Sequence, residues 1–294
     1  MSDFPLISIA MPVFNCAATV GTAVRSLLRQ HYANWELIVL DDGSTDGTLD
    51  IVRRFSDDRI VCIDGGRRRG MAARLNEIIK LSRGEFFARM DGDDVAYPER
   101  LGVQIAYLQQ NPAVAIVGSA MLVFGKEGVP IGKRGTAADE ECRPSLMRSI
   151  PVGHPTFFGR TAWFRDNQYD ETALAGSDQC LLLRTGRLFK IHVLSEVLLG
   201  YREEKLSLRK QVNYRACYFK GAKRFYPAFG VLPSAILLIS QVGKICIDCL
   251  AIASGLNYKI LRHRARPLSN DEVARWWTVW GGVDPGRSEG GTAL

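Results

Sequence analysis

Three aspartates lie within four residues in the stretch FFARMDGDDVAYPERL, residues 86–101. Apolar side chains, interrupted by Arg89, lead directly to Asp91, Asp93 and Asp94. Carboxylates at this spacing repel one another at neutral pH, so the cluster does not stabilise a fold by itself. It indicates a site for a positively charged partner.

A hard divalent cation is one such partner. Mg²⁺ and Mn²⁺ prefer oxygen ligands and share their coordination with substrate phosphates. Gly92 lets the backbone turn tightly beside the ion. The alternative is an acidic loop that caps a helix expected to begin near Pro98, because acidic side chains favour helix N-termini. The position of the cluster opposite Asp41 and Asp42 favours the metal site.

The elements that position this cluster follow from the hydrophobic pattern. Short apolar runs predict strands, and apolar residues at helical spacing predict helices. The expected strands are 6–14, 35–43, 59–64 and 85–90, and the expected helices are 17–30, 47–55 and 71–82. This alternation predicts an α/β fold, a mostly parallel sheet with helices on both faces.

Parallel sheets of this kind bind ligands at the carboxyl ends of their strands. Three polar segments, 12–15, 41–42 and 91–94, each follow an expected strand, so we expect them to meet at one edge of the sheet. Several nucleotide and hydrolase sites are excluded. The chain has no GxGxxG after its first strand, no GxxxxGK[ST], and no GxSxG elbow between an expected strand and the helix after it.

The cysteines and the first residues of the chain indicate the cellular compartment. The seven cysteines are scattered and odd in number, which is typical of free thiols in a reducing compartment. The chain does not open with the cationic, apolar and small residues of a signal peptide, so a cytoplasmic protein is expected. Cys246 and Cys249 form a lone CxxC, which is weak support for metal or redox chemistry.

Positive charge is concentrated in the last third of the chain. Residues 201–294 hold 15 Lys and Arg against 7 Asp and Glu, whereas residues 1–200 hold 23 against 24. Nucleic acid is not expected as the partner, because no zinc-finger, RNP-like or helix-turn-helix pattern accompanies the charge. We expect residues 1–215 to form the main domain and residues 216–294 a separate C-terminal region.

Within this region, residues 228–256 are apolar and interrupted only by Gln241, Lys244 and Asp248. Charges near the centre make membrane spanning unfavourable. Basic residues flank the segment on both sides: Lys220, Lys223, Arg224, Lys259, Arg262, His263, Arg264 and Arg266. This arrangement favours a helix that lies on an anionic membrane surface. A helix packed on the main domain and a spanning helix are the alternatives.

Two further C-terminal stretches are open to interpretation. The aromatic stretch RWWTVWGG, residues 275–282, suits either a membrane interface or a hydrophobic contact with the main domain. The tail 284–294 is rich in Gly and short polar residues, so disorder is expected there.

Four stretches in this order resemble the family 2 inverting glycosyltransferases with the GT-A fold. They are ISIAMPVFN, WELIVLDDGSTDGT, RGMAARLNEIIKLSRGEFFARMDGDDVAYPERL and VGHPTFFGR, and the resemblance covers roughly residues 5–205. It implies a GT-A Rossmann-like sheet, a nucleotide-sugar donor, Mg²⁺ or Mn²⁺, and an inverting displacement at the anomeric carbon.

The resemblance also implies roles for individual residues at the donor site. Pro12, Phe14 and Asn15 match a turn that lies against the base and ribose, and Asp41 and Asp42 match the acid that reads the nucleobase edge. A carboxylate there accepts from an N–H of uracil, which favours UDP weakly. Asp91 and Asp93 match the D-x-D, with Asp91 towards the ribose or metal and Asp93 as a metal ligand.

The general base is implied by the stretch AGSDQCLLLR, residues 175–184. Asp178 matches the family's catalytic aspartate, which takes the proton of the acceptor hydroxyl. Ser177 departs from the family pattern, which usually has Glu there. The alternative is that Asp178 serves as the N-cap of a helix at 179–187.

Four other residues are candidates for the same site. His154 matches a histidine beside the acceptor and metal region, and a core histidine is the alternative. One arginine of the run 67–69, assigned here to Arg69, is expected near the diphosphate, and a solvated basic run is the alternative. Arg74 and Asn76, on the following helix, are expected to face the nucleotide.

The resulting hypothesis is a glycosyltransferase that builds surface polysaccharide or glycolipid. Its acceptor is expected to be a lipid-linked glycan, and its location the cytoplasmic face of the membrane. A sugar-1-phosphate nucleotidyltransferase is one alternative, but it requires a Gly-rich basic loop where this chain has PVFNCAATV. A nucleotide-sugar-binding or scaffold protein without catalysis is the other, motivated by Ser177.

Overall fold

The computed structural model describes most of the chain. The described residues are 4–135, 152–173, 176–186, 188–203, 212, 215–216, 231–254 and 265–284. The basic clusters on either side of the apolar segment lie largely outside these residues, as does the tail beyond Asp284.

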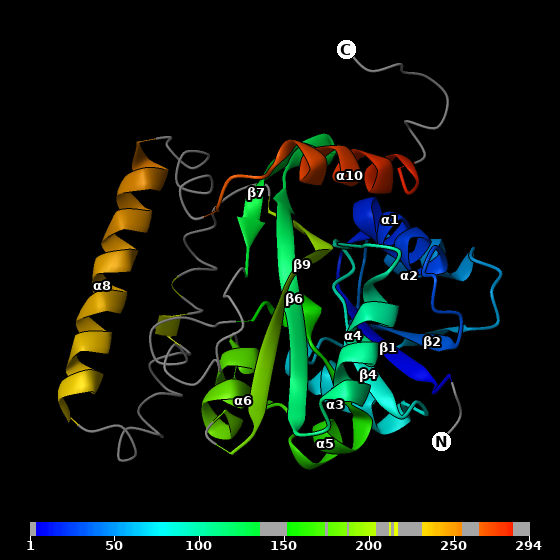
Figure 1. The fold of residues 1–294 in the computed structure, drawn as a ribbon, viewed down its shortest axis with the longest axis horizontal. Helices are drawn as coiled ribbons and strands as arrows, with labels where there is room; N and C mark the ends of the chain where they lie inside the picture. Colours follow the sequence, from blue (N-terminus) through cyan, green and yellow to red (C-terminus); the bar gives the residue numbers. More distant parts are fainter. Residues whose placement is uncertain are drawn as a thin grey trace.

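The strands form one mixed sheet with the order β3-β2-β1-β4-β8-β6-β9-β5, and β7 pairs with β6 (Figure 1). The strands are β1 Ile7–Val13, β2 Trp35–Asp41, β3 Ile60–Asp64, β4 Phe86–Arg89, β5 Val95–Ala96, β6 Val114–Phe124, β7 Pro130–Arg134, β8 Phe158–Arg160 and β9 Lys190–Arg202. The first four are parallel, as the alternating sequence predicts. In the other half only β6 and β9 are parallel to each other, so the sheet as a whole is mixed.

Helices cover both faces of the sheet, which confirms the predicted α/β architecture (Figure 1). They are α1 Ala17–Leu28, α2 Thr48–Arg53, α3 Met71–Leu81, α4 Arg100–Gln110, α5 Thr161–Asp166, α6 Ser177–Thr185, α8 Val231–Ala253 and α10 Asn270–Gly281, with 3-10 turns η1 Lys126–Gly128 and η3 His154–Thr156. Successive side chains of β1 point to opposite faces of the sheet, so they belong to different hydrophobic clusters. Ile9 belongs to the hydrophobic cluster that includes residues of α1 and α4, whereas Ala10 belongs to the cluster that includes residues of α3 and α6.

The helix α10 packs on the second half of the sheet. Trp276 is fully buried, its ring centroid lies 4.8 Å from that of Phe124, and its Nε1 donates to the carbonyl of Gly128 at 2.7 Å. Ser269 and Glu272 form a capping box that begins the helix. The aromatic stretch therefore makes the hydrophobic contact with the main domain. Residues 270–283, assigned from sequence to the C-terminal region, contribute to the core of the sheet domain.

The helix α8, Val231–Ala253, forms most of the apolar segment 228–256 that was singled out in the sequence (Figure 1). Among the helices that the structure describes, none has the length and apolar character of a membrane span. The division of the chain at residue 215 stays a prediction.

Candidate active site

The carboxyl ends of β1, β2 and β4 are neighbours, as expected. Pro12 pairs with Leu40 and Val13 with Asp41 in the parallel register of β1 and β2. On the other side of β1, the N–H of Met90 donates to the carbonyl of Ala10 at 3.0 Å. The three polar segments predicted to converge therefore do meet at one edge of the sheet.

Phe14 and Asn15 form a short loop after β1. The guanidinium of Arg68 lies 4.2 Å from the centre of the Phe14 ring, which is about one-third exposed. Asn15 has a φ of 48°, and its Oδ1 accepts from the backbone N–H of Thr45 at 2.9 Å. Its own N–H donates to the hydroxyl of Ser44 at 2.9 Å, so the loop is fixed against the segment that follows β2.

Asp41 is buried at the end of β2 and presents one unused acceptor. Its Oδ2 accepts from the backbone N–H groups of Gly43 and Ser44, at 3.1 and 2.8 Å. Its Oδ1 is buried and has no hydrogen-bond partner in the structure. A buried carboxylate oxygen without a donor is unfavourable, so this atom suits an N–H group of a ligand.

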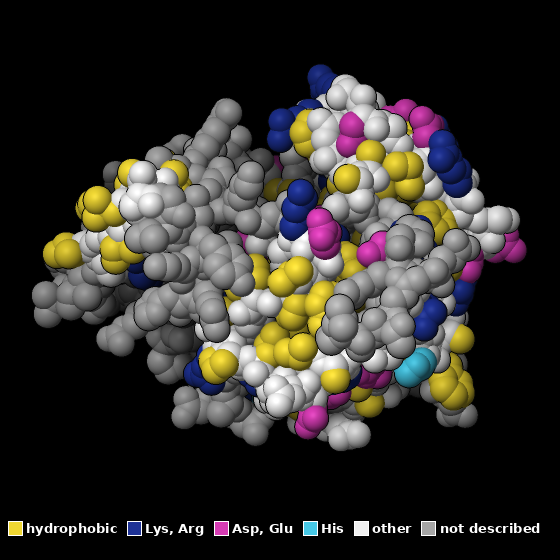
Figure 2. Space-filling view, turned by 90° about the horizontal axis from the view of Figure 1, so that it is seen from above, with side chains coloured by type: hydrophobic (Ala, Val, Ile, Leu, Met, Phe, Trp, Pro, Cys, Tyr) yellow, Lys and Arg dark blue, Asp and Glu magenta, His cyan; other side chains and the backbone are white. Residues whose placement is uncertain are grey.

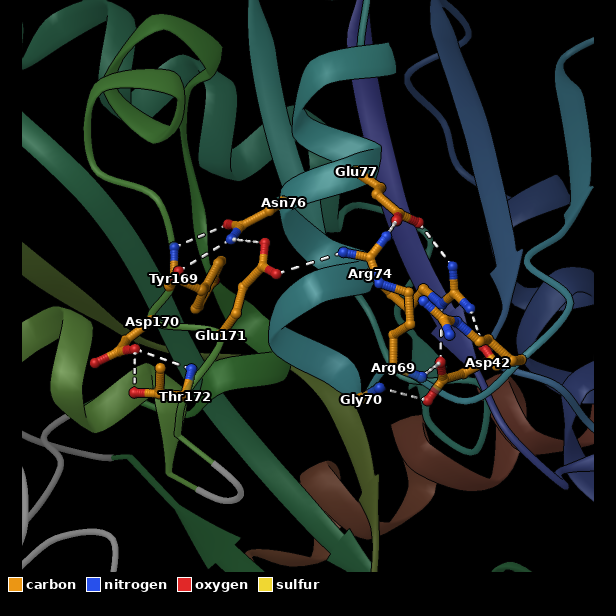
Figure 3. Close-up of polar contacts among 11 residues, drawn as sticks. Asp42, Arg69, Gly70, Arg74, Asn76, Glu77, Tyr169, Asp170, Glu171 and Thr172 are labelled. Atoms are coloured by element: carbon orange, nitrogen blue, oxygen red, sulfur yellow. Dashed lines mark hydrogen bonds and ion pairs between the residues drawn. The ribbon is translucent and has the colours of Figure 1, made fainter.

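Asp42 instead holds the loop between β3 and α3 (Figure 3). It accepts from the backbone N–H groups of Arg69 and Gly70 at 2.7 and 2.9 Å, and from Nε of Arg74 at 2.8 Å. Arg74 is buried and also donates to Glu77 at 2.8 Å and to the Gly65 carbonyl at 2.9 Å. These internal contacts engage both charged groups and shape the loop, and the roles expected for Asp42 and Arg74 at the donor site stay predictions.

The other two predicted residues of this region also make internal contacts. The Arg69 guanidinium pairs with Glu77 and, at 3.5 Å, with Glu171 (Figure 3). The Asn76 amide exchanges two hydrogen bonds with the backbone of Tyr169, at 3.0 and 2.9 Å. Of the run 67–69, it is Arg68 that lies beside the predicted nucleobase turn.

Asp91 forms a two-pronged ion pair with Arg89, the last residue of β4. Nη1 of Arg89 donates to one Asp91 oxygen at 2.7 Å and Nη2 contacts the other. Arg89 is buried, and its positive charge also acts on Asp94, Tyr169 and Asp178. Sequence analysis missed Arg89, although a lone cation inside an apolar strand is itself a signal of a buried partner.

Asp93 and Asp94 are tied to the end of β9 by Arg202. The backbone N–H of Arg202 donates to Asp94 Oδ1 at 3.0 Å, and its Nε donates to the Asp93 carbonyl at 3.0 Å. Asp94 Oδ2 is buried without a partner. Burial, followed by the charges of Asp93 and Asp91, raises the pKa of Asp94 well above its ordinary value.

The three aspartates fit a divalent cation. One carboxylate oxygen from each of Asp91, Asp93 and Asp94 lies within 4.8 Å of the others. The donor set is all oxygen, as Mg²⁺ and Mn²⁺ require, and a cation relieves both the mutual repulsion and the unpartnered oxygen of Asp94. A Cβ at Gly92 would lie 2.9 Å from the Cys16 sulfur, so glycine is needed in this turn.

Asp178 lies in the first turn of α6, directly after Ser177. Gly176, with a φ of 67°, precedes the helix in the left-handed region that favours glycine. Burial raises the pKa of the Asp178 carboxyl, while the Gln179 N–H and the charge of Arg89 lower it and the charge of Asp91 raises it. Asp178 therefore shares one electrostatic environment with the Arg89–Asp91 pair.

His154 belongs to the same environment. Its Nε2 lies 3.0 Å from the hydroxyl of Tyr169. Burial and then the charge of Arg89 lower the pKa of His154 well below its ordinary value, so the imidazole is neutral at pH 7. Burial likewise raises the pKa of the Tyr169 phenol. The pair is a neutral polar contact beside the carboxylates, and sequence analysis missed Tyr169.

The comparison with known families decides the identity. The family model described as "Glycosyl transferase family 2" matches residues 8–168 of this chain. The chain belongs to glycosyl transferase family 2. This is the family that the resemblance implied, and membership in it argues against the nucleotidyltransferase alternative.

Two bacterial relatives illustrate the similarity. The chain is 38% identical over 169 residues to a Bacillus subtilis protein named "Putative glycosyltransferase EpsE", across 56% of this chain and 60% of the relative. It is 37% identical over 123 residues to Escherichia coli WfgD, across 42% and 48%, respectively. WfgD is named as a UDP-Glc:α-D-GlcNAc-diphosphoundecaprenol β-1,3-glucosyltransferase. These matches span roughly half the length of each relative.

Solved structures share the fold. Staphylococcus aureus TarS 1-349 in complex with UDP-GlcNAc superposes with a TM-score of 0.63 at 17% identity, covering 95% of this chain and 81% of TarS. A Pyrobaculum calidifontis mannosyltransferase, in complex with GDP-Man and Mn²⁺, gives a TM-score of 0.59 at 17% identity, covering 95% and 86%. At this identity the likeness establishes the fold alone.

Proposed function

We propose that this family 2 glycosyltransferase transfers a sugar from a nucleoside diphosphate donor to a hydroxyl of a glycan, with inversion at the anomeric carbon. The observation that carries the proposal is the placement of Asp178. This buried carboxylate lies at the start of α6, where it feels the charges of Arg89 and of Asp91, a member of the three-aspartate cluster.

The donor site is assigned to the loops after β1 and β2. The unpartnered Oδ1 of Asp41 accepts from a nucleobase N–H, and the exposed face of Phe14 lies beside the base. A uracil N–H suits this acceptor, so a UDP-sugar is the favoured donor. The relative WfgD is named for a UDP-glucose donor, which supports the choice.

The reaction is a single displacement. Asp178 takes the proton of the acceptor hydroxyl on one carboxylate oxygen, and the hydroxyl oxygen attacks the anomeric carbon. The bond from that carbon to the phosphate oxygen breaks, and the nucleoside diphosphate leaves from the opposite side. Asp93 and Asp91 would hold a Mg²⁺ or Mn²⁺ ion, which would supply positive charge to stabilise the departing diphosphate.

The protein groups around Asp178 prepare it for this role. Burial makes the carboxylate a stronger base than an exposed aspartate, because its pKa is raised. The positive charge of Arg89 limits that rise, so the base remains deprotonated in a larger fraction of molecules. The neutral His154–Tyr169 pair offers polar contacts to the acceptor without competing for its proton.

A lipid-linked glycan on the cytoplasmic membrane face is the proposed acceptor. Its support is the named acceptor of WfgD, a sugar on diphosphoundecaprenol. The basic C-terminal third of the chain, with a net charge of +8, agrees with a substrate on an anionic surface.

The experiment is a donor screen followed by product analysis. Thermal stabilisation of the purified chain by a panel of nucleotide sugars, with and without Mn²⁺, identifies the donor. Transfer to diphosphoundecaprenol-linked acceptors is then measured, and the anomeric configuration of the product is determined by NMR. We expect inversion, and a product with the configuration of the donor would overturn the proposed mechanism.

A further inference from the structure

The outer face of α8 is apolar and exposed. Ile239, Val242, Ile247 and Leu250 have 73, 55, 55 and 70% of their surface exposed, respectively. Their spacing places them along one side of the helix. Figure 1 shows α8 at the left of the view, away from the sheet, and Figure 2 shows apolar side chains on the outer surface of that part of the molecule. Exposed apolar side chains gathered in this way mark an interaction site.

The buried Asp248 of α8 lies on the side of the helix opposite the apolar stripe. Asp248 is fully buried and accepts from Nη2 of Arg215 at 2.9 Å. Asp248 and Leu250 are two residues apart, which is about half a turn around the helix axis. The Asp248 carboxylate and the apolar stripe therefore lie on opposite sides of the helix. The negative charge within the apolar segment is thus paired with Arg215 on the inner side, and the four stripe residues carry no charge.

The sequence around the helix identifies the partner. The chain from residue 201 onward holds 15 Lys and Arg against 7 Asp and Glu, a net charge of +8. An apolar helix face within a strongly basic region suits an anionic bilayer, which offers apolar chains below a layer of negative headgroups. A second copy of the same basic chain would instead repel it.

We propose that the outer face of α8 seats in the surface of an anionic lipid bilayer, with the helix lying parallel to the membrane plane. The apolar stripe enters the boundary between headgroups and acyl chains, and the Arg215–Asp248 pair faces the protein. Binding through this face does not depend on the proposed sugar transfer.

Sedimentation with vesicles tests the proposal on the full chain. Wild-type protein is expected to bind vesicles that contain phosphatidylglycerol at least tenfold more tightly than pure phosphatidylcholine vesicles. Binding is also expected to weaken as salt is added, because salt screens the surface charges. Equal binding to both kinds of vesicle, or to neither, would overturn the proposal.

Matched variants locate the contact. The double variant Ile239→Gln with Leu250→Gln should lose at least tenfold in vesicle affinity. The control pair Leu81→Gln with Leu188→Gln removes exposed leucines of the sheet domain and should bind like wild type. Both pairs should keep the wild-type unfolding midpoint, since all four side chains are exposed. A control pair that loses affinity as strongly as the α8 pair would contradict the assignment of the contact to α8.

Analytical ultracentrifugation without lipid tests a second copy as the occupant. We expect a monomer. A dimer that the α8 variants dissociate, combined with wild type that ignores vesicles, would make this face a self-association surface instead. Transfer to a short, water-soluble analogue of the acceptor, measured without vesicles, keeps loss of vesicle binding distinguishable from loss of the proposed activity.

Discussion

The guanidinium of Arg89 donates to both carboxylate oxygens of Asp91. Arg89 is the last residue of β4, the strand that precedes the aspartate cluster. The pair holds Asp91 in one orientation, since a two-pronged contact fixes both the position and the plane of the carboxylate. The same cation acts on Asp178 from a different segment of the chain. One buried arginine therefore links the proposed metal ligand to the proposed base.

Removing the charge of Arg89 should shift the pH dependence of transfer. Asp178 acts as a base only when deprotonated, so activity rises as pH rises through its pKa. Burial raises that pKa and Arg89 lowers it, so Arg89→Met should move the acidic limb of the kcat/KM profile to higher pH. The measurement is kcat/KM against pH for wild type and variant.

The matched variant Arg89→Lys keeps the charge but cannot make the two-pronged contact. It should leave the acidic limb near its wild-type position and lower turnover by roughly 10-fold to 100-fold through misplaced Asp91. An unshifted limb in Arg89→Met would show that Arg89 does not set the protonation of the base.

Asp93→Ala should abolish the metal dependence of donor binding. The variant removes one of three carboxylates whose oxygens converge, and a hard divalent cation needs several oxygen ligands. Calorimetric titration of the nucleotide sugar with and without Mn²⁺ measures the effect, and Asp58→Ala, a change at an exposed aspartate, serves as the control. Metal-enhanced binding that survives in Asp93→Ala would rule out this site.

Asp94→Asn should stabilise the metal-free protein at neutral pH. Burial and the neighbouring carboxylates raise the pKa of Asp94, so its ionised form destabilises the folded state above that pKa. The amide removes the charge and keeps an oxygen for the Arg202 N–H. Urea unfolding at several pH values should show a gain at neutral pH that shrinks as acid protonates Asp94. An equal gain at every pH would show that charge is not its cause.

Trp276→Ala should destabilise the sheet domain by about 3–5 kcal/mol, because a large buried aromatic side chain is removed. Thr278→Ala, at an exposed position of the same helix, should change stability little. The free energy of unfolding in denaturant measures both. Similar values for the two variants would mean that α10 is not part of the core in solution.

Much of the first half of the fold is readable from sequence. The strands expected at 6–14 and 35–43 are observed at Ile7–Val13 and Trp35–Asp41, because buried parallel strands leave short apolar runs bounded by turn residues. The second half of the sheet was not predicted. Its strands β5 and β8 have two and three residues, respectively, which is too short for a periodic pattern.

Part of the site also required the structure. The aspartates at strand ends are visible in sequence, but the contact from Arg202 to Asp94 joins residues 108 positions apart. The roles of Arg69 and Arg74 show the same limit. Both pair with Glu77, which the sequence did not show, because a cation that binds phosphate and one that forms an internal ion pair have the same sequence signature.

The central claim is that Asp178 takes the proton of the acceptor. Asp178→Asn keeps the size of the side chain but cannot serve as the base, so transfer should fall by about 10²–10⁴. Donor affinity in the presence of Mn²⁺ should match that of wild type and of Asp58→Asn. The decisive measurement is the single-turnover rate of sugar transfer with bound donor. A large loss with intact donor binding is the predicted result, and a rate close to wild type in Asp178→Asn would contradict the account.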